Sequence, residues 1–275
     1  MVKKRPVSSV EEFLSVTAAL SKDWGRDLWF RGEDRADYRP PLRPKLYRRP
    51  LDMLRSPRVG SFLYADQELR IEFRRRAAQL FPQVPADAKW EWYFLMEHYG
   101  VPTRLLDWTD GALVALYFAV QLRASSDRKC DAAVYVLDPA WLNTTARQRR
   151  SRRYWFDGVA LADWRQVQPY LPEEMNNTAL TPELPVAIDP SHRSPRVAAQ
   201  RSRFVIFGRD PDGLMSAAKG EGSRLCKIRV ACTATEKTRQ NLKTDGISES
   251  TVFPDAEGLG RELHSLWTEL CSPGG

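Results

Sequence analysis

Hydrophobic and polar positions recur with two different periods along this chain, and they predict a mixture of helices and strands. Apolar side chains at the three-to-four-residue period of an amphipathic helix occupy 10–25, 61–80, 86–99 and 111–122. Runs of β-branched and aromatic residues, which favour strands, occupy 27–32, 103–108, 131–139, 203–207 and 225–230. Helices and strands therefore intermix along the whole chain, which is typical of the α+β class.

Local signals sharpen several of these boundaries. Ser9 and Glu12 have the spacing of a capping box at the start of the first helix. Gly100, as a left-handed cap, and Pro102 beyond it end the aromatic helix over 86–99. That helix has almost no polar face, so we expect it in the core. The four prolines of 38–50 predict an extended, fairly rigid loop.

The second half of the chain is less regular. Residues 140–194 contain arginines, tryptophans, a polar run and several prolines without a sustained period. We interpret this segment as an insertion of short helices and loops on one domain that spans 1–275. The tail at 251–255 is predicted as a last short strand, followed by a closing helix over 257–270.

Composition excludes several classes of protein. With 275 residues, 43% hydrophobic and 28% charged, the chain fits a globular protein. No apolar run approaches the roughly 18 residues of a membrane span, and no signal-type segment follows Met1, so we expect a cytoplasmic protein without a membrane partner. Four cysteines without a C-x-x-C pair and only three histidines indicate reduced thiols and no metal site.

The chain has a net charge of +7, and its basic residues are unevenly spread, with one densest cluster. Its arginines, followed by Tyr154 and Trp155, are Arg147, Arg149, Arg150, Arg152 and Arg153. Arginines beside aromatic rings suit phosphate contacts with base stacking, so these residues are candidate nucleic-acid ligands. The alternative is a solvated basic loop.

Residues 97–109 are the chain's densest collection of candidate chemistry. Polar and aromatic side chains crowd around a Gly-x-Pro break, namely His98, Tyr99, Arg104, Asp107, Trp108 and Thr109. We interpret the stretch as one wall of a site, with Arg31 at the exit of an early strand and the proline-rich loop opposite. The structural alternative is a buried ion pair between Arg104 and Asp107, with His98 bonded to a carbonyl. Arg31 would then pair with Glu33 or Asp34.

Several short motifs occur along the chain, namely Phe30-Arg31-Gly32, Leu42-x-Pro44, Tyr47-Arg48, the run from His98 to Thr109, Ala115 to Ala119, and Phe253-Pro254-Asp255. Together they resemble the FRG-domain family. The order of elements is also distantly similar to the ADP-ribosyltransferase fold. This resemblance implies a split β-sheet core with flanking helices, to which the basic insertion is added.

The ADP-ribosyltransferase resemblance also implies roles for particular residues. Arg31 matches the arginine that binds NAD, and Thr109 matches the residue with a hydroxyl group at the end of a strand. Gln200 stands nearest the third site position, where that fold has a glutamate. Because Gln200 is neutral, Glu97, His98 or Asp107 must take the role of the carboxylate or base, or the chain binds a nucleotide without transferring it. The candidate catalytic residues are therefore Arg31, His98, Asp107 and Gln200, and the candidate cofactor-binding residues are Arg31, Gly32, Tyr99, Arg104, Trp108 and Thr109.

Transfer from NAD independently requires a cation at the pyrophosphate, an aromatic wall for nicotinamide and a carboxylate or base near the ribose. Arg31 and Arg104 can supply the first, and Trp108 or Tyr99 the second. We expect an ADP-ribosyltransferase, a glycosyltransferase with NAD as its substrate and no metal. RNA is favoured over protein as acceptor, and a toxin or phage-defence effector would suit the activity.

Two alternatives remain at this point. One is a non-enzymatic module that binds a nucleotide or senses a partner. The other is a metal-independent nuclease with His98 as acid or base, for which no second proton-transfer group is identified. Besides RNA or another nucleic acid, an inhibitor protein is a candidate partner.

Overall fold

A single seven-stranded sheet organises the chain. The computed structural model describes residues 5–48, 59–121, 130–148, 158–175, 181–190 and 198–271. Within them the strands follow the order β4-β5-β6-β2-β1-β3-β7, and every neighbouring pair is antiparallel except β4 and β5. The strands are β1 Trp29–Glu33, β2 Leu105–Thr109, β3 Ala132–Leu137, β4 Ala160–Leu161, β5 Val186–Asp189, β6 Ser202–Ile206 and β7 Leu225–Val230. The α+β class predicted from the sequence is confirmed.

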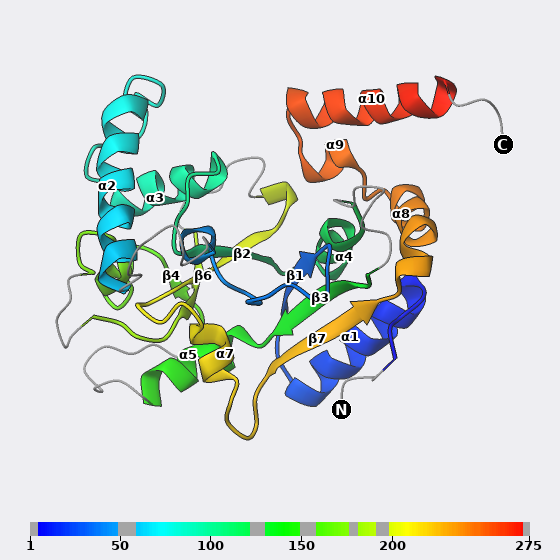
Figure 1. The fold of residues 1–275 in the computed structure, drawn as a ribbon, viewed down its shortest axis with the longest axis horizontal. Helices are drawn as coiled ribbons and strands as arrows, with labels where there is room; N and C mark the ends of the chain where they lie inside the picture. The colour runs from blue at the N-terminus through cyan, green and yellow to red at the C-terminus, as the bar shows by residue number, and fades with distance from the viewer. Residues whose placement is uncertain are drawn as a thin grey trace.

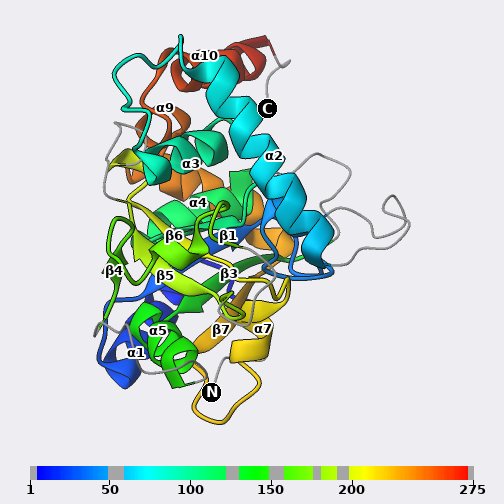
Figure 2. The same cartoon turned by 90° about the vertical axis from the view of Figure 1, so that its left-hand side faces the viewer.

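Helices cover both faces of this sheet (Figure 1). The α-helices are α1 Val10–Trp24, α2 Val59–Ala77, α3 Lys89–His98, α4 Ala112–Gln121, α5 Pro139–Gln148, α7 Gly213–Ala217, α8 Thr235–Thr244, α9 Glu249–Val252 and α10 Ala256–Cys271. Short 3-10 turns are η1 Lys45–Tyr47, η4 Gln168–Tyr170 and η5 Cys232–Ala234. Figure 2 shows α3 and α4 together on one side of the sheet, with α5 and α7 on the other.

The sheet opens between its two central strands. Phe30 of β1 pairs with Thr109 of β2, and this is the single pair of the β-ladder between these two described strands. On its other side β1 pairs with β3 along its whole length, from Trp29 opposite Leu137 to Glu33 opposite Ala133. The residues of β1 after Phe30 and those of β2 before Thr109 are therefore not paired with each other, and the gap between them creates room for a site.

Helix α4 is held close to β1 by a glycine. A Cβ atom on Gly32 would lie 2.0 Å from the carbonyl oxygen of Ala115 and 2.6 Å from the backbone nitrogen of Ala119. Only a residue without a side chain allows this approach. The helix then packs the fully buried Ala115, Leu116 and Val120 into a core shared with α1, α8, β3 and β7. Close packing explains the glycine after Arg31.

Arg104 is a structural residue in the core. Its side chain is completely buried and forms an ion pair with Asp66 of α2 at 2.7 Å. It also donates hydrogen bonds to the carbonyl oxygens of Phe207, at 2.6 Å, and Tyr170. A buried guanidinium requires such full pairing. The structural alternative named a buried ion pair between Arg104 and Asp107. Arg104 does form a buried ion pair, but its partner is Asp66 and not Asp107.

Most elements predicted from the sequence are confirmed. Helices α7 and α8 were not predicted, and two predicted regions differ. The segment 140–194 supplies strands β4 and β5 to the sheet, where only short helices and loops were expected. The strand predicted at 251–255 is absent from that described segment, which begins with the end of helix α9. Ser248 and Thr251 form a capping box there, so local hydrogen bonds favour a helix start.

Candidate functional site

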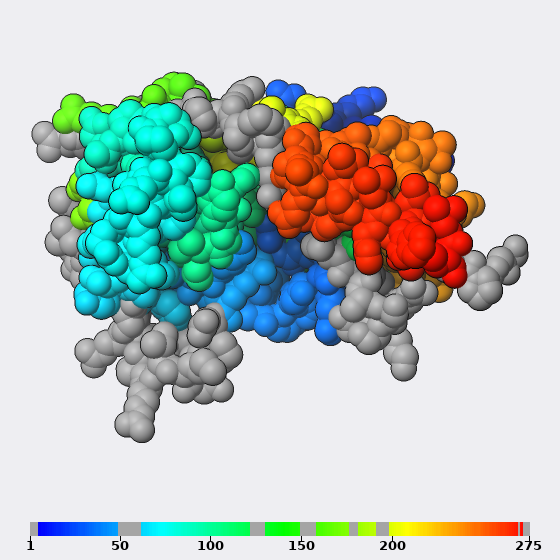
Figure 3. Space-filling view, turned by 90° about the horizontal axis from the view of Figure 1, so that it is seen from above, coloured from blue at the N-terminus to red at the C-terminus, as the bar shows by residue number. Residues whose placement is uncertain are grey.

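A cavity of about 310 Å³ lies over the gap between β1 and β2. Its lining comes from β1, β2, β6 and helices α3 and α4 with the segment after α9, and comprises Phe30, Arg31, Gly32, Lys45, Phe94, Glu97, His98, Asp107, Trp108, Thr109, Phe118, Pro190, Gln200, Ser202, Phe204 and Phe253. In the view of Figure 3 the surface is hollowed between α3 and the α9–α10 segment. We call this space the split-sheet cavity. It collects all four candidate catalytic residues, Arg31, His98, Asp107 and Gln200.

Arg31 spans the gap between the central strands. Its Nη1 atom donates a hydrogen bond to the backbone carbonyl oxygen of Asp107 at 2.8 Å. Its Nε atom pairs with Glu33 at 3.3 Å, which is the partner that the structural alternative named. Glu33 is buried and also lies 3.6 Å from Arg48. The guanidinium is thus fixed at the cavity with a carboxylate behind it, and a charged group held in this way is preorganised for an anion.

Glu97 places a buried carboxyl group in the same cavity. The hydroxyl of Thr103 donates to it at 2.5 Å, and the Nζ atom of Lys45 lies 3.4 Å from its other oxygen. Burial, followed by the nearby charge of Asp107, raises the pKa of Glu97 to about 7. A carboxyl group that titrates near neutral pH inside a cavity has the properties of a proton-transfer group.

The remaining polar candidates enter from three different elements. His98 ends α3, and its ring centroid lies 4.9 Å from that of Tyr99. Asp107 is an exposed residue of β2. Thr109 is buried, and its Oγ1 atom accepts a hydrogen bond from the backbone of Gly111 at 2.9 Å, just before α4. Gln200 stands in the turn before β6, so the cavity joins segments that are far apart in sequence.

Two of the predicted cofactor ligands do not line the cavity. Arg104 is fully buried in its ion pair with Asp66, so it is unable to reach a ligand, and this prediction is wrong. Tyr99 is 57% exposed, and its ring packs against Phe81 with centroids 5.4 Å apart. Trp108 does line the cavity, although its Nε1 atom is buried without a hydrogen-bond partner among the described residues. The aromatic wall therefore comes mainly from other rings.

Five phenylalanines form that wall, and the sequence pattern did not single them out. Phe94 of α3 and Phe204 of β6 lie with ring centroids 5.0 Å apart. Phe118 of α4 meets Phe253, just after α9, edge to face at 5.9 Å. Phe30 completes the set. Phe30, Phe118 and Phe253 belong to the motifs noted in the sequence, so motif membership was the available signal, whereas nothing marked Phe94 or Phe204.

Most of the basic cluster lies outside the described residues. Arg147 is exposed near the end of α5. Arg149, Arg150, Arg152 and Arg153 lie outside the described residues. Among the described residues no group of three or more His, Cys, Asp or Glu side chains is arranged to hold a metal ion. No helix in the described part of the chain is long and apolar enough to cross a membrane.

Comparison with known families bears directly on the split-sheet cavity. Residues 26–128 match the family model of the FRG domain. The chain contains an FRG domain. The matched segment of this FRG domain includes β1, α3, β2 and α4, and therefore Arg31, Glu97, His98 and Asp107. Comparisons with curated proteins and with solved structures found no match.

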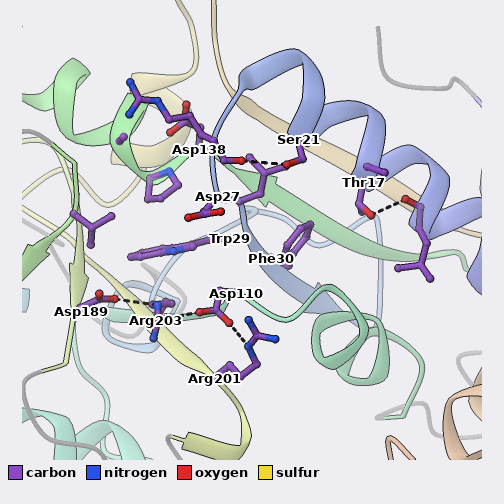
Figure 4. A pocket seen from close by; sticks show the side chains of 17 residues that line it. Thr17, Ser21, Asp27, Trp29, Phe30, Asp110, Asp138, Asp189, Arg201 and Arg203 are labelled. Carbon is purple, nitrogen blue, oxygen red and sulfur yellow. Dashed lines mark hydrogen bonds and ion pairs between the residues drawn. The ribbon is translucent and has the colours of Figure 1, made fainter. Parts of the chain in front are cut away.

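Strand β6, which also lines the split-sheet cavity, lies outside the segment that matches the FRG domain. Strand β6, after Gln200, presents Ser202 and Phe204 to the split-sheet cavity. The alternate residues Arg201 and Arg203 face a second cavity of about 750 Å³ (Figure 4). There Asp110 pairs with both arginines, and the Arg203 contact measures 2.6 Å. Arg201 has a φ of 50°, and its ion pair with Asp110 lies beside the turn that carries Gln200, which lines the split-sheet cavity.

Proposed function

We propose that the split-sheet cavity binds NAD and that the protein transfers its ADP-ribosyl group to a macromolecule. The observation that carries this proposal is that four groups line one aromatic cavity. They are the guanidinium of Arg31, the β2 strand that ends at Thr109, the β6 strand that follows Gln200, and the carboxyl group of Glu97. Arg31, Thr109 and Gln200 lie on or beside the adjacent strands β1, β2 and β6. This order supports the resemblance to the ADP-ribosyltransferase fold drawn from the sequence.

The cavity matches the chemical requirements of the transfer one by one. Its volume is near the lower limit for small-molecule sites, so it would take the nicotinamide ribose end of the dinucleotide. Phenylalanine rings would flank the nicotinamide, and Arg31 would face the pyrophosphate. An aromatic pocket also excludes water from the oxocarbenium-like state.

Glu97 fills the role left open by the neutral Gln200. In the proposed step the bond between the nicotinamide nitrogen and the ribose C1′ breaks, and the nitrogen keeps the electron pair. The acceptor nucleophile forms a bond to C1′ and gives its proton to the Glu97 carboxylate. A pKa near 7 suits this exchange, because the group can take the proton and then release it to solvent.

RNA is the acceptor that the charge of the chain favours. The net charge of +7 and the arginines from Arg147 to Arg153 would bind a phosphate backbone. Neutralising Arg149 and Arg150 should weaken RNA binding and flatten its salt dependence. Unchanged binding would shift the proposal toward a protein acceptor. A toxin or phage-defence role would suit either activity.

A labelling experiment tests the proposal. The purified protein is incubated with NAD labelled in the adenylate, together with total RNA or with cell lysate. We expect label retained on a macromolecule and free nicotinamide released, and both should disappear in Arg31→Ala. Labelling that persists in both Arg31→Ala and Glu97→Gln would exclude the split-sheet cavity as the site.

Gln200 supports a second candidate function. A neutral amide at the third position can bind a ribose hydroxyl but is unable to accept a proton in the reaction. The protein would then be a nucleotide-binding or partner-sensing module. Saturable NAD binding without nicotinamide release would favour this reading, whereas RNA shortened without NAD would favour the nuclease alternative.

A further inference from the structure

Helix α10, the last helix of the described chain, exposes its large apolar side chains to solvent. Five large apolar residues of α10 are 44–73% exposed, namely Leu259, Leu263, Leu266, Trp267 and Leu270. At 100° per residue they fall within a stripe of about 100° on one side of the helix. We call these five residues the α10 stripe. Figures 1 and 3 show α10 at the periphery, beyond α9.

The polar side of α10 is the side nearer the domain, and the contacts that hold it there come from the first half of the helix. His264, Ser265 and Thr268 line a cavity of about 330 Å³ together with residues of α4 and α8. Arg261 forms an ion pair with Glu249 at 2.5 Å, and Glu262 accepts hydrogen bonds from Ser248 and from the backbone of Ser250 at 2.8 and 2.7 Å. These contacts fix the first half of the helix and set the stripe outward.

An amphipathic helix normally buries its apolar side, and most of its stability comes from that burial. Here each described side chain from Leu263 to Cys271 is exposed. An apolar patch of this kind marks an interaction surface. The helix therefore needs a partner for the stripe.

The spacing of the stripe fits another copy of this chain as the partner. The leucines follow intervals of four, three and four residues, a sequence that reads the same from both ends. A two-fold axis between antiparallel helices would place Leu259 on Leu270 of the partner subunit, and Leu263 on Leu266 of the partner subunit. A closed two-fold dimer requires this self-complementarity.

Trp267 lies at one edge of the stripe. In the register that sets Leu263 on Leu266 of the partner subunit, it stands opposite Glu262 of the partner subunit. The exposed area of two stripes is on the order of 1,000 Å², which reaches the lower limit for a specific interface.

Charge argues against a membrane as the partner. Helices that lie on membrane surfaces carry Lys and Arg on their polar side. Helix α10 carries Glu257, Glu262 and Glu269, with Arg261 as its single Lys or Arg residue. We propose that the protein forms a two-fold dimer through antiparallel packing of the α10 stripes.

Sedimentation equilibrium of the full chain tests this proposal. We expect a concentration-dependent dimer, with a dissociation constant raised at least tenfold in Leu263→Glu and in Leu270→Glu, because each change enters a two-fold interface twice. Leu80→Glu is the matched control, since Leu80 is 74% exposed but lies far from α10 in sequence. Circular dichroism confirms that each variant is folded.

Several outcomes would overturn the proposed α10 dimer. These are a monomeric wild type across the concentration range, a dimer that both α10 variants retain, and a monomer that sediments with phosphatidylglycerol vesicles. Oxidation with diamide tests the orientation of the helices. Parallel helices would bring Cys271 against Cys271 of the partner subunit and yield a cross-link that Cys271→Ser removes, whereas the antiparallel pairing keeps the two thiols at opposite ends.

Discussion

Arg31 and Asp107 are joined across the gap in the sheet by a hydrogen bond of 2.8 Å from Nη1 to the backbone carbonyl oxygen. The bond replaces the strand pairing that ends at Phe30 and Thr109. Glu33 holds the Nε atom of the same guanidinium. The side chain of Arg31 therefore connects β1 and β2 across the gap that forms the cavity.

The first prediction concerns the geometry of this arginine. Arg31→Lys keeps the positive charge but loses the planar group that contacts Glu33 and the Asp107 carbonyl together. We expect nicotinamide release from NAD to fall at least tenfold, equivalent to about 1.4 kcal/mol. Arg35→Lys is the control, because Arg35 pairs with Asp37 on the surface. Equal activity in both variants would show that charge alone suffices at position 31.

The second prediction follows from the buried carboxyl group of Glu97. Its pKa of about 7 lies above the ordinary value of 4.5, so the folded state holds the proton more tightly than the unfolded state. This stabilisation is complete below about pH 4.5 and is lost as the pH rises through about 7. Relative to wild type, Glu97→Gln should therefore gain stability between pH 5 and pH 8.

Urea unfolding at several pH values measures this difference. One pKa unit corresponds to about 1.4 kcal/mol, so the gap between variant and wild type should grow by at least about 1 kcal/mol. Glu91→Gln serves as the control on the same helix, outside the cavity lining. A gap that stays constant with pH would mean that Glu97 is not perturbed by its surroundings.

The third prediction tests the buried ion pair. Arg104→Met leaves the carboxylate of Asp66 buried without its cation, and should cost about 3–5 kcal/mol of unfolding free energy. The double variant Arg104→Met with Asp66→Leu removes both charges. It should be less destabilised than the sum of the two single variants, as a double-mutant cycle by chemical denaturation would show. Strict additivity would argue against the pairing.

The fourth prediction concerns Gly32. In Gly32→Ala the new methyl group meets the backbone of α4 at 2.0 Å, so the helix must move away from β1. We expect a loss of roughly 1–3 kcal/mol or more, together with weaker NAD binding, since α4 also carries Phe118 into the cavity. Gly220→Ala, where nothing lies within 4 Å, should have little effect on thermal unfolding.

Short-range patterns determined the elements around the site. Ser9 caps the start of α1 as predicted, and its hydroxyl accepts a hydrogen bond from the backbone of Glu12 at 3.2 Å; the Glu12 carboxylate accepts from the backbone of Ser8 at 2.9 Å, one residue before the position that the capping box predicted. Gly100 has a φ of 77° and ends the aromatic helix. The strand of Arg31 also forms where its run of strand formers indicated. Each of these features depends on neighbours within a few residues, so the sequence alone encodes them.

Only the tertiary structure decided which candidates share a space. Arg104 and Asp107 are three residues apart, yet Arg104 turns to Asp66 in the core while Asp107 faces the cavity, because alternate residues of a strand point to opposite sides. The cavity position of Glu97 and the outward stripe of α10 likewise depend on contacts between distant segments. A charged residue takes the partner that folding brings near, and the local sequence does not specify that partner.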